Sequence, residues 1–212
     1  MTTRPVVDRA ATAAPRFAIA VLAKAPLPGL AKTRLIPLLG PQGAARLQRW
    51  LLRRTLNTVA AAQLGPLTLW CSPDIDHPDF AACRKFPELD LQRQPEADLG
   101  QRMLHAARQS SAAIGTLIVG TDCPLLDVDD LRRVAGELEA GADVVLIPAE
   151  DGGYVLIALR RPDAALFADI DWSTPRVLVQ TRQRALASGL RVVELAPHWD
   201  VDLPADYLRL LG

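Results

Sequence analysis

Short, uninterrupted apolar runs alternate with longer amphipathic segments along most of this chain, and no other feature restricts its fold as much. The first run covers residues 17–22, and similar runs cover 116–119 and 143–147. A strand that is apolar on both faces has to be covered on both sides, which is typical of a parallel sheet between layers of helices. Segments such as 42–62 place their leucines at helical spacing. We therefore expect an α/β fold, a three-layer sandwich with a mostly parallel central sheet.

The other expected elements complete this alternation. Further strands are expected at 67–71, 89–94, 154–158 and 190–195. Helices are expected at 98–111, between a cap at Asp127 and an end at Gly141, and from Thr174 and Pro175 onward. Ligands of such sheets bind at the carboxyl ends of the strands, so side chains that directly follow a strand are the candidates for function.

Length and charge limit the class of protein. The chain has 212 residues, of which 50% are hydrophobic, and its 24 Lys and Arg balance 24 Asp and Glu. A chain of this length usually forms one domain, which we expect over 16–212, after a disordered tail over 1–15. The balanced charge argues against nucleic acid or an anionic membrane as the main partner. No apolar stretch approaches the roughly 20 residues of a membrane helix, and three cysteines without a CxxC pair suit a reducing cytoplasm.

The loop over residues 24–34 directly follows the first expected strand. It carries Lys24, Lys32 and Arg34, is stiffened by two prolines, and can turn sharply at Gly29. Cations fixed on a rigid loop can neutralise a triphosphate at little cost in ordering entropy. The glycine spacing matches neither a Walker A loop nor a dinucleotide-binding fingerprint. We interpret this segment as a phosphate-binding loop, with a solvent-exposed basic loop as the alternative.

A second candidate follows the expected strand at 116–119, where the sequence reads Gly-Thr-Asp-Cys-Pro. Asp122 at the end of a central strand could hold Mg²⁺ over bound phosphates, because Mg²⁺ favours one or two carboxylates together with phosphate oxygens. Asp122 could instead cap the next helix, although Asp127 lies nearer to its start. Cys123 has no neighbouring histidine in the sequence, so we expect it to pack rather than to act as a nucleophile.

Two further acidic segments are candidates, one directly after an expected strand and one near the C-terminus. Glu-Asp-Gly-Gly-Tyr at 150–154 could let the backbone approach a ligand closely, although a plain glycine turn between two strands would look similar. Asp200 and Asp202 alternate, so in an extended segment their side chains point the same way. They could complete a metal site with Asp122, or they could cap the final helix.

The ordered set of these motifs resembles a bacterial family known as DUF2064 or glycosyltransferase-like. The motifs that carry the resemblance lie at 23–35, 98–103, 120–124, 150–154, 172–174 and 200–202. The resemblance covers roughly residues 16 to 210. It implies the glycosyltransferase A-type fold of the nucleotide-diphospho-sugar transferases. The family is also similar to phospholactate guanylyltransferases and to the nucleotidyltransferases that modify the molybdenum cofactor.

The resemblance also implies roles for individual residues. Lys32 and Asp122 would be catalytic. Nucleotide and phosphate contacts would come from Lys24, Gly29, Lys32, Thr33, Arg34, Arg102, Asp151, Gly152 and Gly153. The ligands of Mg²⁺ or Mn²⁺ would be Asp122, Asp202 and Asp200.

The activity expected from these roles is Mg²⁺-dependent transfer of a nucleoside monophosphate from a nucleoside triphosphate to a small anionic acceptor, with release of pyrophosphate. A glycosyltransferase would be expected to carry an Asp-x-Asp motif after a central strand, where this chain has the single Asp122. Glycosyl transfer from a nucleotide-sugar nevertheless stays open as the alternative. A non-catalytic nucleotide-binding protein is a third possibility, from another class.

Overall fold

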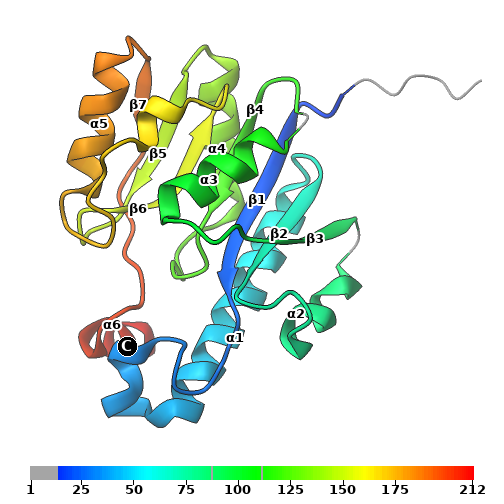
Figure 1. The fold of residues 1–212 in the computed structure, drawn as a ribbon, viewed down its shortest axis with the longest axis vertical. Helices are drawn as coiled ribbons and strands as arrows, with labels where there is room; N and C mark the ends of the chain where they lie inside the picture. Colours follow the sequence, from blue (N-terminus) through cyan, green and yellow to red (C-terminus); the bar gives the residue numbers. More distant parts are fainter. Residues whose placement is uncertain (1–13, 87, 111) are drawn as a thin grey trace, which may run out of the picture.

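The framework of the fold is one seven-stranded sheet, seen in Figure 1. The computed structural model describes residues 14–212 except Pro87 and Ser111, so nearly all of the expected tail over 1–15 lies outside the described residues. The strand order is β3-β2-β1-β4-β6-β5-β7, and only β6 runs antiparallel to its neighbours. The bounds are β1 Phe17–Lys24, β2 Leu67–Ser72, β3 Leu89–Arg93, β4 Gly115–Val119, β5 Val144–Pro148, β6 Tyr154–Leu159 and β7 Val192–Glu194. The expected mostly parallel sheet is confirmed.

Helices connect the parallel strands and cover both faces of the sheet. They are α1 Ile36–Ala62, α2 Pro78–Ala81, α3 Leu99–Arg108, α4 Val128–Glu139, α5 Val177–Ala187 and α6 Pro204–Leu211. Short 3₁₀ turns add η1 Thr33–Leu35, η2 Ala82–Lys85 and η3 Ala164–Phe167. None of the helices in the described part of the chain is both long enough and apolar enough to cross a membrane.

Two apolar clusters, one on each face of the sheet, form the main core. Val21 of β1 belongs to the same cluster as Leu56 of α1 and Leu131 of α4. On the opposite face, Ile118 of β4 belongs to the same cluster as Leu104 of α3, which α5 also joins. The central strands are buried on both sides because successive side chains point to opposite faces. This arrangement confirms the predicted three layers.

A third, smaller cluster brings the end of the chain next to its first loop. Trp199 and Val201 are buried with Leu35, which immediately precedes α1, and with Leu51 in the middle of that helix. The guanidinium of Arg209 on α6 lies 4.6 Å from the centroid of the Trp199 ring. Figure 1 shows α6 beside the start of α1. Residues separated by more than 160 positions therefore share one corner of the molecule.

Three of the predicted boundaries are wrong. Helix α5 begins at Val177 with Arg176 as its cap, and Thr174 instead accepts the N–H of Arg176 within the preceding turn. Helix α1 begins at Ile36 rather than 42, with a kink at Gly40, where φ is 68°. The strand predicted at 190–195 is reduced to β7, because it forms the edge of the sheet and pairs only with β5.

The turn between β5 and β6 shows why a glycine is required there. Gly152 has a φ of +92°, and a Cβ at this position would lie 2.3 Å from the carbonyl oxygen of Pro175. The carbonyl of Gly152 also accepts the N–H of Leu178 at 2.9 Å, which fixes the start of α5. The neighbouring Gly153 has an ordinary φ, and a Cβ there would meet only a carboxylate oxygen of Asp151, at 3.3 Å.

We expect Gly152→Ala to lower the free energy of unfolding by roughly 2–4 kcal/mol, because it adds both backbone strain and a clash with Pro175. Gly153→Ala is the matched control and should change it by less than about 1 kcal/mol. Equilibrium denaturation of both variants measures the difference. Equal effects of the two substitutions would contradict this account of the turn.

Candidate active site at the carboxyl edge of the sheet

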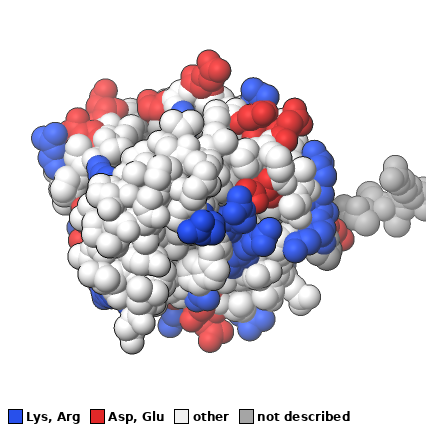
Figure 2. Space-filling view, turned by 90° about the horizontal axis from the view of Figure 1, so that it is seen from below, with Lys and Arg blue, Asp and Glu red and all other residues white. Residues whose placement is uncertain are grey.

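The carboxyl ends of β1 and β4 are neighbours in the sheet, and the loop after each strand carries charged residues. We call residues 24–34 the basic loop, and residues 195–203, which connect β7 to α6, the strap. The strap crosses this edge of the sheet, because the N–H of Val201 donates to the carbonyl of Asp122 at 2.9 Å. Figure 2 views the molecule from this end and shows Lys and Arg side chains gathered beside acidic ones.

Lys32 joins the basic loop to both other segments. Its Nζ lies 2.6 Å from Oδ1 of Asp122 and donates to the carbonyl of Val201 at 2.7 Å. The Lys32 side chain is only 4% exposed, whereas that of Asp122 is 48% exposed. The backbone of Lys32 is left-handed, with φ 47° and ψ 48°, a conformation that is unusual for residues other than glycine. The structure therefore brings the two predicted catalytic residues into contact.

A second ion pair links the basic loop to the strap. Nη1 of Arg34 lies 2.5 Å from Oδ2 of Asp202, and the two side chains are 61% and 39% exposed. The carboxylate of Asp206, not that of Asp202, accepts the N–H groups at the start of α6, from Asp202 at 3.1 Å and from Leu203 at 2.6 Å. The alternative that Asp200 and Asp202 cap the final helix is thus wrong.

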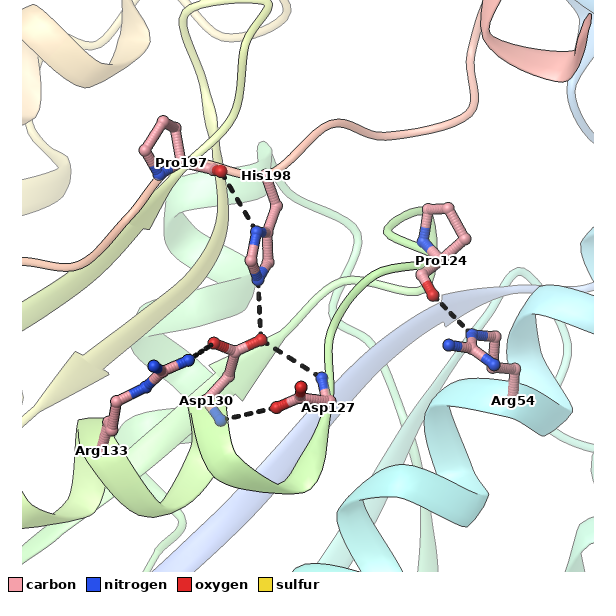
Figure 3. A network of polar contacts seen from close by, with 7 residues as sticks. All are labelled: Arg54, Pro124, Asp127, Asp130, Arg133, Pro197 and His198. Atoms are coloured by element: carbon pink, nitrogen blue, oxygen red, sulfur yellow. Dashed lines mark hydrogen bonds and ion pairs between the residues drawn. The ribbon is translucent and has the colours of Figure 1, made fainter. Parts of the chain in front are cut away.

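Helix α1 holds the loop of Asp122 in place. Nε2 of Gln48 donates to Oγ1 of Thr121 at 3.1 Å, and both side chains are buried. Nε of Arg54 donates to the carbonyl of Pro124 at 2.6 Å, as Figure 3 shows. Helix α4 is capped by Asp127, whose carboxylate accepts the N–H of Asp130 at 2.8 Å. The cap at Asp127 is confirmed, and Asp122 is left free for another role.

A buried aspartate on α4 anchors the strap (Figure 3). Nε2 of His198 lies 2.7 Å from Oδ2 of Asp130, whose other oxygen contacts Arg133 at 2.5 Å. Asp130 is 3% exposed, and this burial raises its pKa, but the hydrogen bonds from His198 and Arg133 outweigh it and lower the pKa overall. The backbone of His198 also donates to Pro148 at the end of β5, at 2.9 Å. The sequence gives no sign of this partner for His198, because 68 positions separate the two residues.

Asp200 lies on the strap among other carboxylates. Burial is the main cause that raises its pKa to about 6, and the negative charges of Asp151 and Asp122 add to the shift, while Lys32 opposes it. This part of the edge is therefore short of positive charge. Across the described ranges, however, no group of three or more His, Cys, Asp or Glu side chains is arranged to hold a metal ion.

The remaining predicted site residues lie around this edge in different environments. Lys24 is exposed at the end of β1 and makes no ion pair with any described residue. Gly29 has a φ of +84° and open space around it, and Thr33 is exposed at the start of η1. Asp151 is also exposed, and its Oδ1 accepts the N–H of Gly153 at 2.9 Å within the β5–β6 turn.

Arg102 belongs to a bonded cluster that the sequence analysis missed. Its Nε donates to the carbonyl of Ala97 at 2.7 Å, and its Nη1 lies 3.5 Å from Oε1 of Gln94. Gln94 is buried, and its Nε2 donates to the carbonyls of Ala23 at 3.0 Å and Trp70 at 2.8 Å. Gln94 thereby ties together the ends of β1 and β2. No local pattern could have indicated it, because its partners are 71 and 24 positions away.

Cys123 packs in the core, as predicted. It is 6% exposed within the cluster on the α1 and α4 face. Burial is the main cause that raises the pKa of its thiol to about 11. A thiol with this pKa is almost entirely protonated near neutral pH and is therefore a poor nucleophile.

Comparison with known proteins identifies the family. The sequence model of DUF2064, described as an uncharacterized protein conserved in bacteria, matches residues 55–174, which is more than half of the chain. The chain belongs to the DUF2064 family. No curated protein matches its sequence.

Solved structures match nearly the whole chain. A candidate nucleotide-diphospho-sugar transferase from Desulfovibrio desulfuricans G20 is 28% identical, with a TM-score of 0.80, over 89% of this chain and 83% of that one. The nucleotidyl transferase Mth528 from Methanothermobacter thermautotrophicus is 16% identical, with a TM-score of 0.62, and the match covers 92% of this chain and 95% of that one. Rv0371c from Mycobacterium tuberculosis H37Rv, crystallised with manganese, is 18% identical, with a TM-score of 0.52, and the match covers 92% of this chain and 98% of that one. The expected nucleotide-diphospho-sugar transferase fold of this DUF2064 protein is confirmed.

We expect Asp200→Asn to stabilise the metal-free protein at pH 8. The folded protein holds the proton of Asp200 more tightly than the unfolded chain does, so ionised Asp200 lowers the stability above pH 6. Solvent screens this partly exposed group, so the cost should be about 1–2 kcal/mol, less than the whole pKa shift corresponds to. The gain from asparagine should shrink between about pH 6 and pH 4 and vanish below, where aspartate is protonated in both states. Thermal unfolding at several pH values tests this, with the exposed Asp76→Asn as the control. A gain that is independent of pH would contradict it.

We expect His198 and Asp130 to be energetically coupled. Removing His198 leaves a buried carboxylate with one donor fewer, so His198→Ala should cost about 1–3 kcal/mol of stability. In an Asp130→Asn background the same substitution should cost less, with a coupling of at least about 1 kcal/mol. Denaturation of the two single variants and the double variant completes this cycle. Additive effects would show that the anchor does not stabilise the strap.

Proposed function

We propose that this DUF2064 protein is a nucleotidyltransferase that uses a nucleoside triphosphate with a divalent cation. The observation that carries the proposal is the contact between cations of the basic loop and carboxylates of two other segments, Lys32 with Asp122 and Arg34 with Asp202. Cations suited to phosphate and carboxylates suited to a metal ion thus share one edge of the sheet, where ligands of such folds bind.

The carboxylates at this edge fit a divalent cation. Asp122 and Asp200 are hard oxygen donors, which suit Mg²⁺ or Mn²⁺. The pKa of Asp200 is raised by burial and by its carboxylate neighbours, and a bound cation would relieve that repulsion. These two residues would hold the ion, with Asp202 as a third candidate ligand. When bound, the ion would supply positive charge that stabilises the developing charge on the phosphate oxygens.

The side chains would contribute position and charge rather than a covalent intermediate. Lys32, Arg34 and Lys24 would bind the triphosphate oxygens and orient the α-phosphorus. An oxygen of the anionic acceptor would then form a bond to that phosphorus. The bond from the α-phosphorus to the oxygen bridging it to the β-phosphate would break, and its electron pair would leave with pyrophosphate. Cys123 is too deeply buried and too strongly protonated to take part as a nucleophile.

Glycosyl transfer is the second candidate, favoured by the description of the structure from Desulfovibrio desulfuricans as a candidate nucleotide-diphospho-sugar transferase. The same cations and carboxylates would then hold a nucleotide-sugar and stabilise the nucleoside diphosphate that leaves. The two reactions differ in their products. Nucleotidyl transfer consumes a triphosphate and yields pyrophosphate, whereas glycosyl transfer consumes a nucleotide-sugar and yields a diphosphate.

Thermal shift against nucleoside triphosphates and nucleotide-sugars, each with and without Mg²⁺, tests the proposal. A ligand that binds only the folded protein raises the free energy of unfolding, and the increase grows with the logarithm of the ratio of ligand concentration to Kd. We expect one triphosphate to give a shift that requires Mg²⁺. Asp122→Asn should weaken this Mg²⁺-dependent binding at least about tenfold. The variant should still fold, because Lys32 keeps hydrogen bonds to asparagine and to the carbonyl of Val201, but it should be less stable than the wild type, because the charge of Lys32 loses its carboxylate. Each shift is therefore measured against the same variant without ligand.

Asp129→Asn is the matched control, because this carboxylate is 80% exposed on α4 and lies outside the proposed site. A shift confined to nucleotide-sugars would support glycosyl transfer instead. No shift with any of these ligands, or an equal loss with Asp129→Asn, would contradict both reactions.

A further inference from the structure

We propose that the site accepts a divalent cation and a triphosphate only as a pair. Without ligands, the side chains of Lys32 and Arg34 neutralise the carboxylates of Asp122 and Asp202. Phosphate oxygens would take the place of these carboxylates as partners of the two basic side chains, and the carboxylates could then bind the divalent cation. This inference rests on the proposed function. It concerns which form of the ligands the chain can bind, and it assigns to Lys32 the role of an internal counter-ion for Asp122.

The two carboxylates on either side of the basic loop already have cationic partners. Lys32 lies 2.6 Å from Asp122, and Arg34 lies 2.5 Å from Asp202. A divalent cation that arrives alone has to compete with these side chains for the same oxygens. A triphosphate that arrives alone has to draw the same side chains away from their carboxylates. Either ligand alone therefore breaks the ion pairs and leaves one member of each pair without a partner of opposite charge.

The Lys32 pair dominates this competition because of its burial. The Lys32 side chain is 4% exposed, and Nζ already donates both to Asp122 and to the carbonyl of Val201. Although Asp122 is 48% exposed, drawing it away from Lys32 is costly, because the buried charge of the lysine is left uncompensated. The Arg34 pair is largely exposed, and exposed ion pairs contribute little. Lys32 should therefore carry most of the effect.

The remaining carboxylates at this edge also favour binding of a cation together with phosphate rather than of either ligand alone. Asp200 and Asp151 make no ion pair with any described residue, and the negative charge of Asp151 acts on Asp200. Among the residues that the structure describes, however, no three ligating side chains form a metal site. A divalent cation held by one or two carboxylates needs further oxygen ligands, which phosphates commonly supply. Once Lys32 turns to a phosphate, Asp122 is released to join Asp200 around the cation.

Isothermal titration of the full-length protein with Mn²⁺, with tripolyphosphate and with their complex tests this proposal without knowledge of the base. We expect the complex to bind at least about tenfold more tightly than either component, which lies within the usual range of coupling between two ligands. In Lys32→Met, Mn²⁺ alone should bind about fivefold more tightly than to the wild type, and the advantage of the complex should fall by a similar factor.

Lys85→Met is the matched control, because this exposed lysine makes no ion pair with another described residue. Circular dichroism checks that Lys32→Met folds. If it does not, Arg34→Gln should show the same direction of change with a smaller size, since its side chain is 61% exposed.

The outcomes separate this inference from the function on which it rests. Independent binding of Mn²⁺ and tripolyphosphate to the wild type, each with the same affinity as in the complex, would overturn the inference and leave the proposed function standing. A tightening of Mn²⁺ binding in Lys85→Met as large as in Lys32→Met would also overturn it. No binding of any of the three probes would contradict the proposed function itself.

Discussion

The contact of a buried lysine with one carboxylate and one carbonyl is the interaction on which the rest of the site depends. Lys32 is 4% exposed and reaches both Asp122, after β4, and Val201, on the strap. A buried ammonium needs such partners, because burial of an unpaired charge is far more costly than any single surface contact. The position of the basic loop is therefore set by β4 and the strap, and not by the loop alone.

The strand order explains why the strap reaches this place at all. Strand β7 lies at one edge of the sheet, beyond β5 and β6, whereas α6 packs beside the start of α1. The chain between them has to run back across the carboxyl ends of β5 and β4. Backbone bonds from His198 to Pro148 and from Val201 to Asp122 mark its path. Asp200 lies between these two bonds, so the topology itself delivers its carboxylate to the edge that carries Lys32.

The sequence pattern predicts the strands, helices and caps that depend on residues close in sequence. It does not predict contacts between segments that are distant in the sequence. The buried strand β4 and the cap at Asp127 follow from apolar runs and side-chain chemistry close in sequence. The sequence predicts the start of α5 too early, because that start depends on Gly152, a residue of another turn whose carbonyl accepts the N–H of Leu178. The candidate residues Lys32 and Asp122 could be found, because each lies in the loop that follows a buried strand. Their contact, like that of Gln94 with Trp70, depends on the order of strands in the sheet, which no local spacing encodes.

Two aspartates, Asp200 on the strap and Asp130 beside it on α4, have pKa shifts in opposite directions. Both are affected by burial, which raises the pKa of a carboxyl group. Asp130 receives hydrogen bonds from His198 and Arg133 that outweigh its burial, so its negative charge is already satisfied and it stabilises the fold. Burial and the carboxylates of Asp151 and Asp122 raise the pKa of Asp200 to about 6, although Lys32 and a backbone hydrogen bond oppose the shift. A carboxylate with this excess of negative neighbours is the one that an added cation would stabilise most, so we propose that the ion binds at Asp200, together with Asp122, and not at Asp130.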